Sequence, residues 1–130
     1  MDITIDPSAI LAVLLNEPSK SILLEQTQGA ELHSAPSLPW EVGNALTALL
    51  KRRRIDVSQA KRALDAFRRI PVRLVEIDLE RTLELAADHD IYAYDAYIIE
   101  CARQHATPLL SLDRRQCEVA AGVGVEVVEV

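Results

Sequence analysis

The chain has 130 residues, of which 49% are hydrophobic, and its 20 acidic and 14 basic residues give a formal net charge of -6. This length fits one compact domain spanning residues 1–130, and the hydrophobic content excludes an intrinsically disordered chain. The acidic balance argues against a protein that holds nucleic acid by bulk electrostatics, but it leaves room for a nuclease whose bound metal ions supply positive charge locally.

The first part of the chain predicts short elements separated by turn residues. Residues 2–6 alternate polar and apolar side chains at period two, which is typical of a strand. Pro7 ends this strand, and Ser8 can cap a helix that continues to Leu15. After it, the sequence predicts a helix over residues 19–28 and a second strand over residues 31–35.

The clearest predicted helix runs from Ser37 to Lys51. Ser37 suits its N-cap, Pro39 its first turn, and the basic residues at its end favour the negative pole of the helix dipole. Ser58 is the expected cap of a helix over residues 57–69. The remaining chain predicts strands over residues 71–77, 109–112 and 125–130, and helices over residues 79–89, 94–105 and 114–121.

Strands that alternate with helices in this way predict an α/β sandwich with a mainly parallel sheet. The two cysteines, Cys101 and Cys117, match neither a metal-ligand spacing nor a disulfide framework, so we expect free thiols in a reducing compartment. No apolar run approaches the length of a membrane span, and the first residues do not have the pattern of a signal peptide. We therefore expect a cytoplasmic protein with no membrane-bound part.

Two of the predicted strands end in aspartate, at Asp6 and at Asp113. In a parallel sheet, ligands bind beyond the carboxyl ends of the strands, so both carboxylates are expected on the same edge. The alternative is that each aspartate only caps the helix that follows it, because aspartate is a favoured cap and turn residue.

Glu41 and Asp95 lie on the apolar stripes of their predicted helices. A carboxylate on a core-facing stripe is costly unless a cation or hydrogen-bond donors compensate it. One alternative is a partly buried salt bridge with Arg52 or Arg103. Taken with Asp6 and Asp113, however, the four acids predict a divalent cation site, because clustered carboxylates repel one another unless a cation neutralises them. Oxygen-only ligands suit Mg²⁺ or Mn²⁺ rather than zinc, and the three histidines have no zinc-type spacing.

Four blocks of sequence, in this order, resemble the PIN-domain family, and in particular the VapC-type toxins of prokaryotic toxin–antitoxin pairs. The blocks are Ile5–Leu11, Pro39–Leu46, Tyr94–Ala102 and Leu109–Asp113. The resemblance implies a PIN-like three-layer sandwich, with a central mainly parallel sheet flanked by helices. It also implies an endoribonuclease that uses Mg²⁺ or Mn²⁺ to activate water, with a cognate antitoxin as partner and a homodimer as the expected assembly.

Carried over by position, the resemblance makes Asp6, Glu41, Asp95 and Asp113 the catalytic metal ligands. Ser8 matches a small hydroxyl residue that accompanies the first aspartate in the family. Asn44 matches a frequent family residue, although helix packing is its simpler role. Some relatives have a further acid shortly after the last aspartate, but residues 114–116 are Arg, Arg and Gln, so a fifth ligand is not expected.

An acidic ribonuclease must still bind RNA. The candidate basic residues are Arg52, Arg53, Arg54, Arg68 and Arg69, with the alternative that they are solvated helix ends. Tyr94 is the tyrosine best placed for stacking against an unpaired base, although packing is the simpler role for the tyrosines near Asp95.

Other classes fit less well. A haloacid-dehalogenase-like domain needs a second aspartate two residues after the first, where Ser8 stands. A receiver domain needs an acidic pair and a lysine that the sequence lacks, and the four glycines form no nucleotide-binding loop. Two alternatives stay open: a PIN-fold binding module that assembles with an antitoxin-like partner, and an RNA-processing nuclease that is not a toxin. Five apolar residues could line a partner groove, a homodimer face or the core: Leu11, Leu14, Leu15, Ile22 and Leu23.

Overall fold

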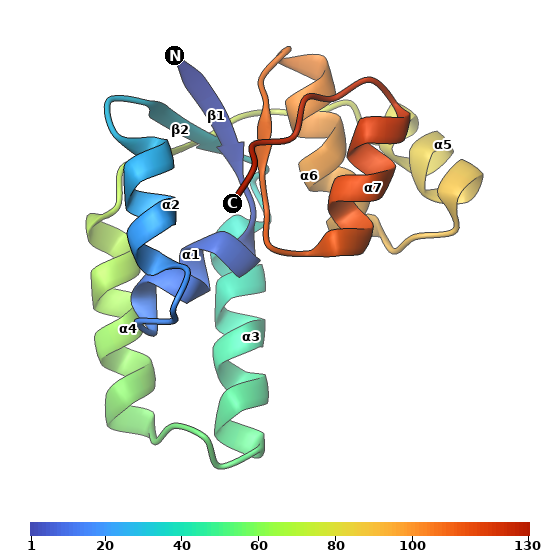
Figure 1. The fold of residues 1–130 in the computed structure, drawn as a ribbon. Helices are drawn as coiled ribbons and strands as arrows, with labels where there is room; N and C mark the ends of the chain where they lie inside the picture. Colours follow the sequence, from blue (N-terminus) through green and yellow to red (C-terminus); the bar gives the residue numbers. More distant parts are fainter.

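The computed structural model describes residues 1–130 as four strands and seven helices (Figure 1). The strands are β1 (Asp2–Ile5), β2 (Glu31–Ser34), β3 (Val72–Leu74) and β4 (Leu109–Leu110). The helices are α1 (Pro7–Leu14), α2 (Lys20–Thr27), α3 (Leu38–Lys51), α4 (Val57–Arg69), α5 (Leu79–His89), α6 (Ala93–Gln104) and α7 (Arg114–Gly122).

The sheet has the order β3-β2-β1-β4, and all its strand pairs are parallel. Alternation along β1 separates two cores: Ile3 and Ile5 pack with the apolar residues of α1 to α4, whereas Thr4 on the other face bonds the Thr107 hydroxyl at 2.6 Å. A second apolar cluster lies under α5, α6 and α7, so helices cover both faces of the sheet (Figure 1). The predicted three-layer α/β sandwich is confirmed.

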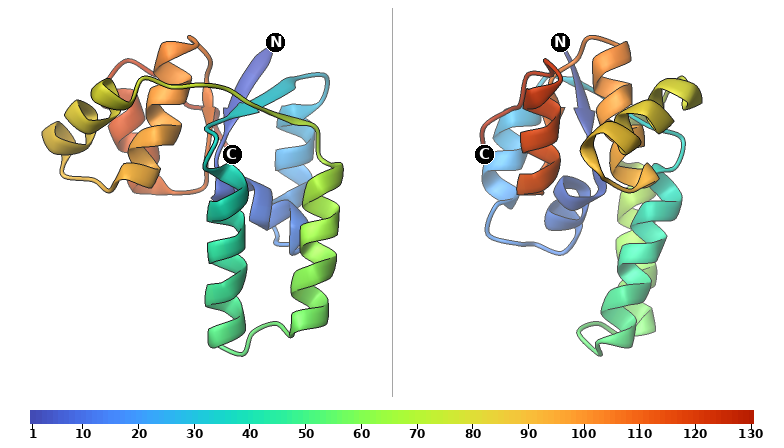
Figure 2. Two further views of the ribbon diagram at one scale, coloured as in Figure 1. Left: turned by 180° about the vertical axis from the view of Figure 1, so that it is seen from behind. Right: turned by 90° about the vertical axis from the view of Figure 1, so that its right-hand side faces the viewer.

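Helices α3 and α4 form an antiparallel hairpin that extends beyond the sheet in both views of Figure 2. α4 begins with a capping box, in which the Asp56 carboxylate accepts from the Gln59 N–H and the Gln59 side chain accepts from the Asp56 N–H. The prediction that Ser58 caps α4 is therefore wrong, because the N-cap is Asp56. The cap expected at Ser8 is also wrong, because Pro7 has the fixed φ that suits the first helical position and so Asp6 becomes the N-cap of α1.

The four strands that form are shorter than predicted, and the fifth predicted strand, over residues 125–130, does not form. Residues 125–130 make only an isolated bridge between Val127 and Leu109, with hydrogen bonds from Leu109 N to Glu126 O and from Val128 N to Leu109 O. The cause is that β4 has only two residues, so it offers too few rungs for a further strand. β3 similarly spans three residues of the predicted 71–77. No helix is long and apolar enough to cross a membrane.

Candidate active site

The four acidic residues singled out in the sequence line one cavity at the carboxyl ends of β1 and β4. The cavity has a volume of about 290 Å³. Its other walls include the accessory candidates Ser8 and Asn44 and the RNA-binding candidate Tyr94, together with Pro7, Leu11, Ala45 and Gln116. The fold therefore brings together Asp6, Glu41, Asp95 and Asp113, which are far apart in the sequence.

Each acid is positioned by the first turn or the N-cap of a different helix. Asp6 and Asp113 are the N-caps of α1 and α7, and they accept hydrogen bonds from the N–H groups of Ala9 and Gln116. Glu41 lies in the first turn of α3, and Asp95 lies in the first turn of α6. Helix N-termini are the positive poles of the helix dipoles, so four such poles support the negative charge of the cavity. Capping and convergence of the acids are thus compatible.

Asp6 is held by two hydroxyl groups, one of which sequence reasoning missed. Ser8 Oγ donates to Asp6 Oδ1 at 2.7 Å, and Ser111 Oγ donates to Asp6 Oδ2. The same hydroxyls accept from the backbone N–H groups of Leu112 and Asp113, at 2.9 and 3.0 Å. Because these N–H groups donate to side-chain hydroxyls and not to a neighbouring strand, β4 ends after two residues and the chain bends to bring Asp113 to the cavity. Ser111 thus joins the first and last acids of the site.

The negative charge of the cavity has no cationic partner in the protein. No Lys, Arg or His group lies within 4.0 Å of the four carboxylates. The alternative prediction, that Glu41 or Asp95 forms a salt bridge with Arg52 or Arg103, is wrong. Arg103 pairs with Glu100, and Arg52 lies at the opposite end of α3 from Glu41. A hydrogen bond from Ser37 Oγ to Glu41 Oε2, at 2.7 Å, is the compensation that the protein itself provides at Glu41.

Burial and mutual repulsion raise the pKa values of three of these acids. Desolvation is the main cause for each of them. The pKa of Glu41 rises to about 7, with further increases from the charges of Asp95 and Asp6. The pKa values of Asp6 and Asp95 are also raised, and in both cases the charge of Asp113 adds to the effect of burial. Clustered carboxylate oxygens without a cationic partner in the protein are ligands of the type that a hard divalent cation such as Mg²⁺ or Mn²⁺ prefers.

A second group of metal-type side chains lies at the other edge of the sheet. The donor atoms of Asp2, Glu31 and His33 lie within 4.8 Å of one another. Asp2 and Glu31 are register partners at the amino ends of β1 and β2, whereas Asp6 follows the carboxyl end of β1. The two groups are therefore separated by the length of the strands and cannot share an ion. The spacing of the histidines along the sequence missed this group, because it depends on strand pairing.

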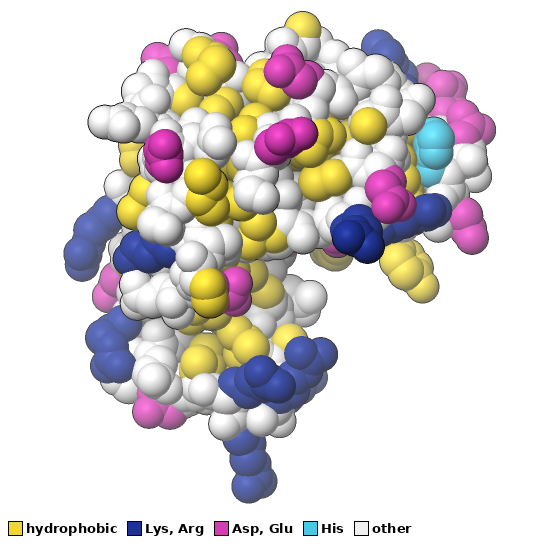
Figure 3. Space-filling view, viewed as in Figure 1, with side chains coloured by type: hydrophobic (Ala, Val, Ile, Leu, Met, Phe, Trp, Pro, Cys, Tyr) yellow, Lys and Arg dark blue, Asp and Glu magenta, His cyan; other side chains and the backbone are white.

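The basic residues expected to bind RNA lie away from the cavity. Arg52, Arg53 and Arg54 are in the turn between α3 and α4, where Figure 3 shows a cluster of Lys and Arg at the end of the hairpin. Glu41 is at the other end of α3, a 14-residue helix about 20 Å long. Arg68 and Arg69 end α4, and Arg68 pairs with Asp65 at 3.7 Å. Of the RNA-binding candidates, only Tyr94 lines the cavity, and the arginines remain predictions for an extended substrate.

The five apolar candidates for a partner surface separate into different environments. Leu23 is fully buried in the core, Ile22 is half-buried on α2, and Leu11 lines the acidic cavity. Leu14 and Leu15 line a groove of about 520 Å³ between α1, α3 and α4, whose charged lining residues are Arg54, Arg62 and Glu17. Apolar side chains with a net positive charge suit an acidic, amphipathic segment.

The model of the PIN domain family matches residues 3–122. The chain belongs to the PIN domain family. Among curated PIN-type relatives, "VapC ribonuclease Mb0985" of Mycobacterium bovis and "Ribonuclease VapC9" of Mycobacterium tuberculosis are each 32% identical over 115 residues, covering 87% of this chain and 87% of the relative. The crystal structure of PAE2754 from Pyrobaculum aerophilum has the same fold, with a TM-score of 0.70 and 21% identity over 92% of this chain and 87% of that one.

The raised pKa of Glu41 predicts that the cation-free PIN domain becomes less stable as pH rises. Between pH 4.5 and about 7 the folded protein retains a proton on Glu41 that the unfolded chain loses. The free energy of unfolding therefore falls through this window, by about 1–2 kcal/mol for this solvent-screened group. In chelator, Glu41→Gln should flatten the dependence of Tm on pH, whereas Glu84→Gln, at an exposed site on α5, should not. Parallel curves for wild type and Glu41→Gln would contradict this account.

Proposed function

We propose that this protein is a divalent-metal-dependent endoribonuclease that cleaves RNA phosphodiester bonds by water activation. The observation that carries the proposal is the convergence of Asp6, Glu41, Asp95 and Asp113 in one cavity without a cationic side chain. Membership of the PIN domain family and the two mycobacterial relatives named as ribonucleases support the same activity. Mg²⁺ or Mn²⁺ is the proposed cofactor.

The side chains of the cavity divide the work between binding and orientation. A divalent ion held there supplies positive charge for the scissile phosphate and lowers the pKa of a water molecule. Asp6, Asp95 and Asp113 are the proposed direct ligands. Ser8 and Ser111 keep both oxygens of Asp6 in fixed positions through their hydroxyl groups. Glu41 lies in the same cavity and is the proposed acceptor of a proton from the attacking water, and the Ser37 hydroxyl fixes its orientation.

We further propose that the protein is the toxin of a type II toxin–antitoxin pair in the cytoplasm. The support is the similarity of 87% of the chain to the VapC ribonucleases. The groove between α1, α3 and α4, with Leu14 and Leu15 on its floor, is the proposed binding site for the antitoxin. A homodimer is the proposed assembly.

The test is cleavage of end-labelled mixed cellular RNA by the purified protein. We expect fragments with Mg²⁺ or Mn²⁺, and none with chelator, because the carboxylates alone repel the phosphate. Activity should return when Mg²⁺ is added in excess over the chelator. Cutting that persists in chelator, or a folded protein that never cuts with either metal, would refute the proposal and favour a binding module.

A further inference from the structure

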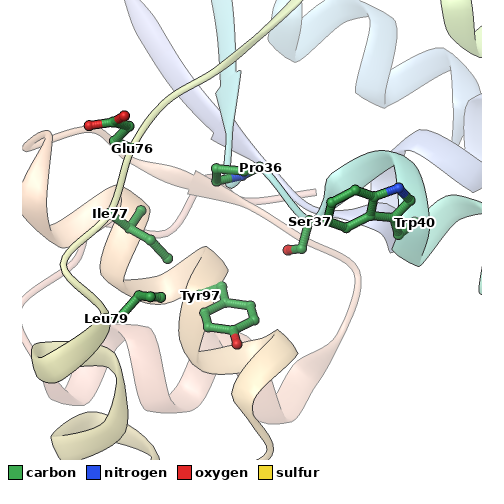
Figure 4. Close-up of a pocket in the computed structure, with 7 residues that line it drawn as sticks. All are labelled: Pro36, Ser37, Trp40, Glu76, Ile77, Leu79 and Tyr97. Atoms are coloured by element: carbon green, nitrogen blue, oxygen red, sulfur yellow. The ribbon is translucent and has the colours of Figure 1, made fainter.

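A second, mainly apolar pocket lies beside the acidic cavity. It has a volume of about 410 Å³ and is lined by Pro36, Ser37, Trp40, Glu76, Ile77, Leu79 and Tyr97 (Figure 4). We refer to it as the Trp40 pocket. Trp40 is the single tryptophan of the chain, and 73% of its surface is exposed. Exposing a large aromatic side chain to water is energetically unfavourable, and exposed apolar surface of this kind is typical of ligand-binding or partner-binding sites.

Two contacts join the Trp40 pocket to the acidic cavity. Ser37, which lines the pocket, donates to Glu41, which lines the cavity. Tyr97 of the pocket and Tyr94 of the cavity are in edge-to-face contact, with ring centroids 5.9 Å apart. Trp40 lies in the first turn of α3 and Tyr97 directly follows the first turn of α6, and these are the helices that carry Glu41 and Asp95. The pocket and the acids are therefore parts of one continuous surface.

The lining of the Trp40 pocket decides what kind of group it suits. It contains no Lys, Arg or His, so it has nothing to attract a phosphate or an acidic side chain. Figure 4 shows the indole of Trp40 on one side of the Tyr97 ring, with Ile77 and Leu79 on the other side. Flat, uncharged rings stack well on such aromatic surfaces, whatever the identity of the base.

We propose that the Trp40 pocket binds one unpaired nucleobase of the RNA substrate, stacked on the indole of Trp40, next to the phosphate that the acidic cavity would hold. This inference rests on the proposed ribonuclease function and adds a subsite to it. Trp40 is then a substrate-binding residue, and the enzyme requires a single-stranded or looped RNA from which a base can turn outward. Stacking on the ring gives affinity without strong base preference.

Trp40 provides its own reporter, because all tryptophan fluorescence of the protein comes from this ring. The Asp95→Asn variant in Mg²⁺ would be titrated with a six-nucleotide single-stranded RNA and with an abasic ribose–phosphate oligomer of equal length. We expect saturable quenching by the RNA and little quenching by the abasic oligomer. In the same background, Trp40→Ala should weaken RNA binding measured by anisotropy about 5- to 100-fold, the range of one base–aromatic stack. Trp40→Phe should restore most of it.

Leu24→Ala, which removes an exposed apolar side chain on α2, should bind RNA as tightly as its parent. Equal quenching by RNA and abasic oligomer, or RNA binding that leaves Trp40 emission unchanged, would overturn the inference. So would a concentration-dependent emission shift without RNA that accompanies a dimer mass in light scattering, because a second copy would then cover Trp40. If wild type still cleaves RNA in these cases, only the pocket inference fails. If the protein neither binds nor cleaves RNA, the proposed function fails with it.

Discussion

Asp95→Asn is expected to reduce metal-dependent RNA cleavage by roughly 10²- to 10³-fold, the loss typical when one group that stabilises developing charge is removed. Asp95 is the most informative of the four acids because its carboxylate accepts no hydrogen bond within the protein, so the amide leaves the local structure intact. The change removes one charged oxygen ligand while keeping the shape of the side chain. The assay is cleavage of labelled RNA at saturating Mg²⁺, with kcat and KM measured separately.

Although Asp95→Asn should reduce activity, it should not reduce the stability of the cation-free protein. Burial and the charge of Asp113 raise the pKa of Asp95, which means that the ionised carboxylate destabilises the cation-free protein. In chelator, Asp95→Asn should therefore unfold at the same Tm as wild type or at a higher one. Added Mg²⁺ should raise the Tm of wild type more than that of the variant.

Asp88→Asn is the matched control, because Asp88 is exposed on α5 and lies outside the cavity. It should cleave RNA at the wild-type rate. Cleavage by Asp95→Asn at the wild-type rate would remove Asp95 from the proposed site, whereas loss of activity together with a large fall of Tm in chelator would show that the variant is only misfolded.

The position of the acids follows from the sequence because it depends on local rules. Asp6 follows a strand that is recognisable from its alternating pattern, and Asp113 follows one that is recognisable as an apolar run; parallel strands present such residues at one edge of the sheet. Glu41 and Asp95 occupy helices whose period is clear. The family resemblance adds the order of the blocks, and the family and the fold are both confirmed.

What the sequence did not reveal depends on packing between distant segments. Ser111 holds Asp6 across 105 residues, and no local pattern distinguishes it from an ordinary loop serine. The prediction of a strand over residues 125–130 is wrong, because their alternating pattern does not show how many residues of β4 are available for pairing. Trp40 belongs to a recognisable sequence block, but its exposure depends on how residues of α3 and α6 come together around the Trp40 pocket.

Glu100 is the least expected feature of α6, because a glutamate in the middle of an apolar stripe has no exposed surface at all. Its Oε1 accepts from Arg103 Nε at 2.8 Å, and its Oε2 lies 3.5 Å from Arg81 Nε on α5. Arg103 is mostly covered, whereas half of the Arg81 side chain is exposed. The pair with Arg103 is therefore the main compensation for a carboxylate buried between α5 and α6.

Arg103→Ala is expected to lower the free energy of unfolding by about 3 kcal/mol, because it leaves the Glu100 carboxylate buried with a single, longer ionic contact. For a domain of this size the loss corresponds to a fall in Tm of roughly 10 °C. The matched control is Arg68→Ala, which breaks the Arg68–Asp65 pair, in which both side chains are more than 60% exposed. That pair should contribute less than about 1 kcal/mol. Thermal and urea unfolding in chelator would measure both losses.

Combining Arg103→Ala with Glu100→Gln separates the cost of the buried charge from the loss of packing by the arginine. If the uncompensated carboxylate causes the loss, the double variant should be more stable than Arg103→Ala alone, since the buried group is then neutral. If the effects of the two single substitutions simply add in the double variant, the two residues act independently and the ion pair within α6 contributes no coupling energy. Because α6 also carries Asp95 and Tyr97, we expect a loosened α6 to disturb both the acidic cavity and the Trp40 pocket. A folded Arg103→Ala protein should then lose RNA cleavage on warming well before it loses its helix content.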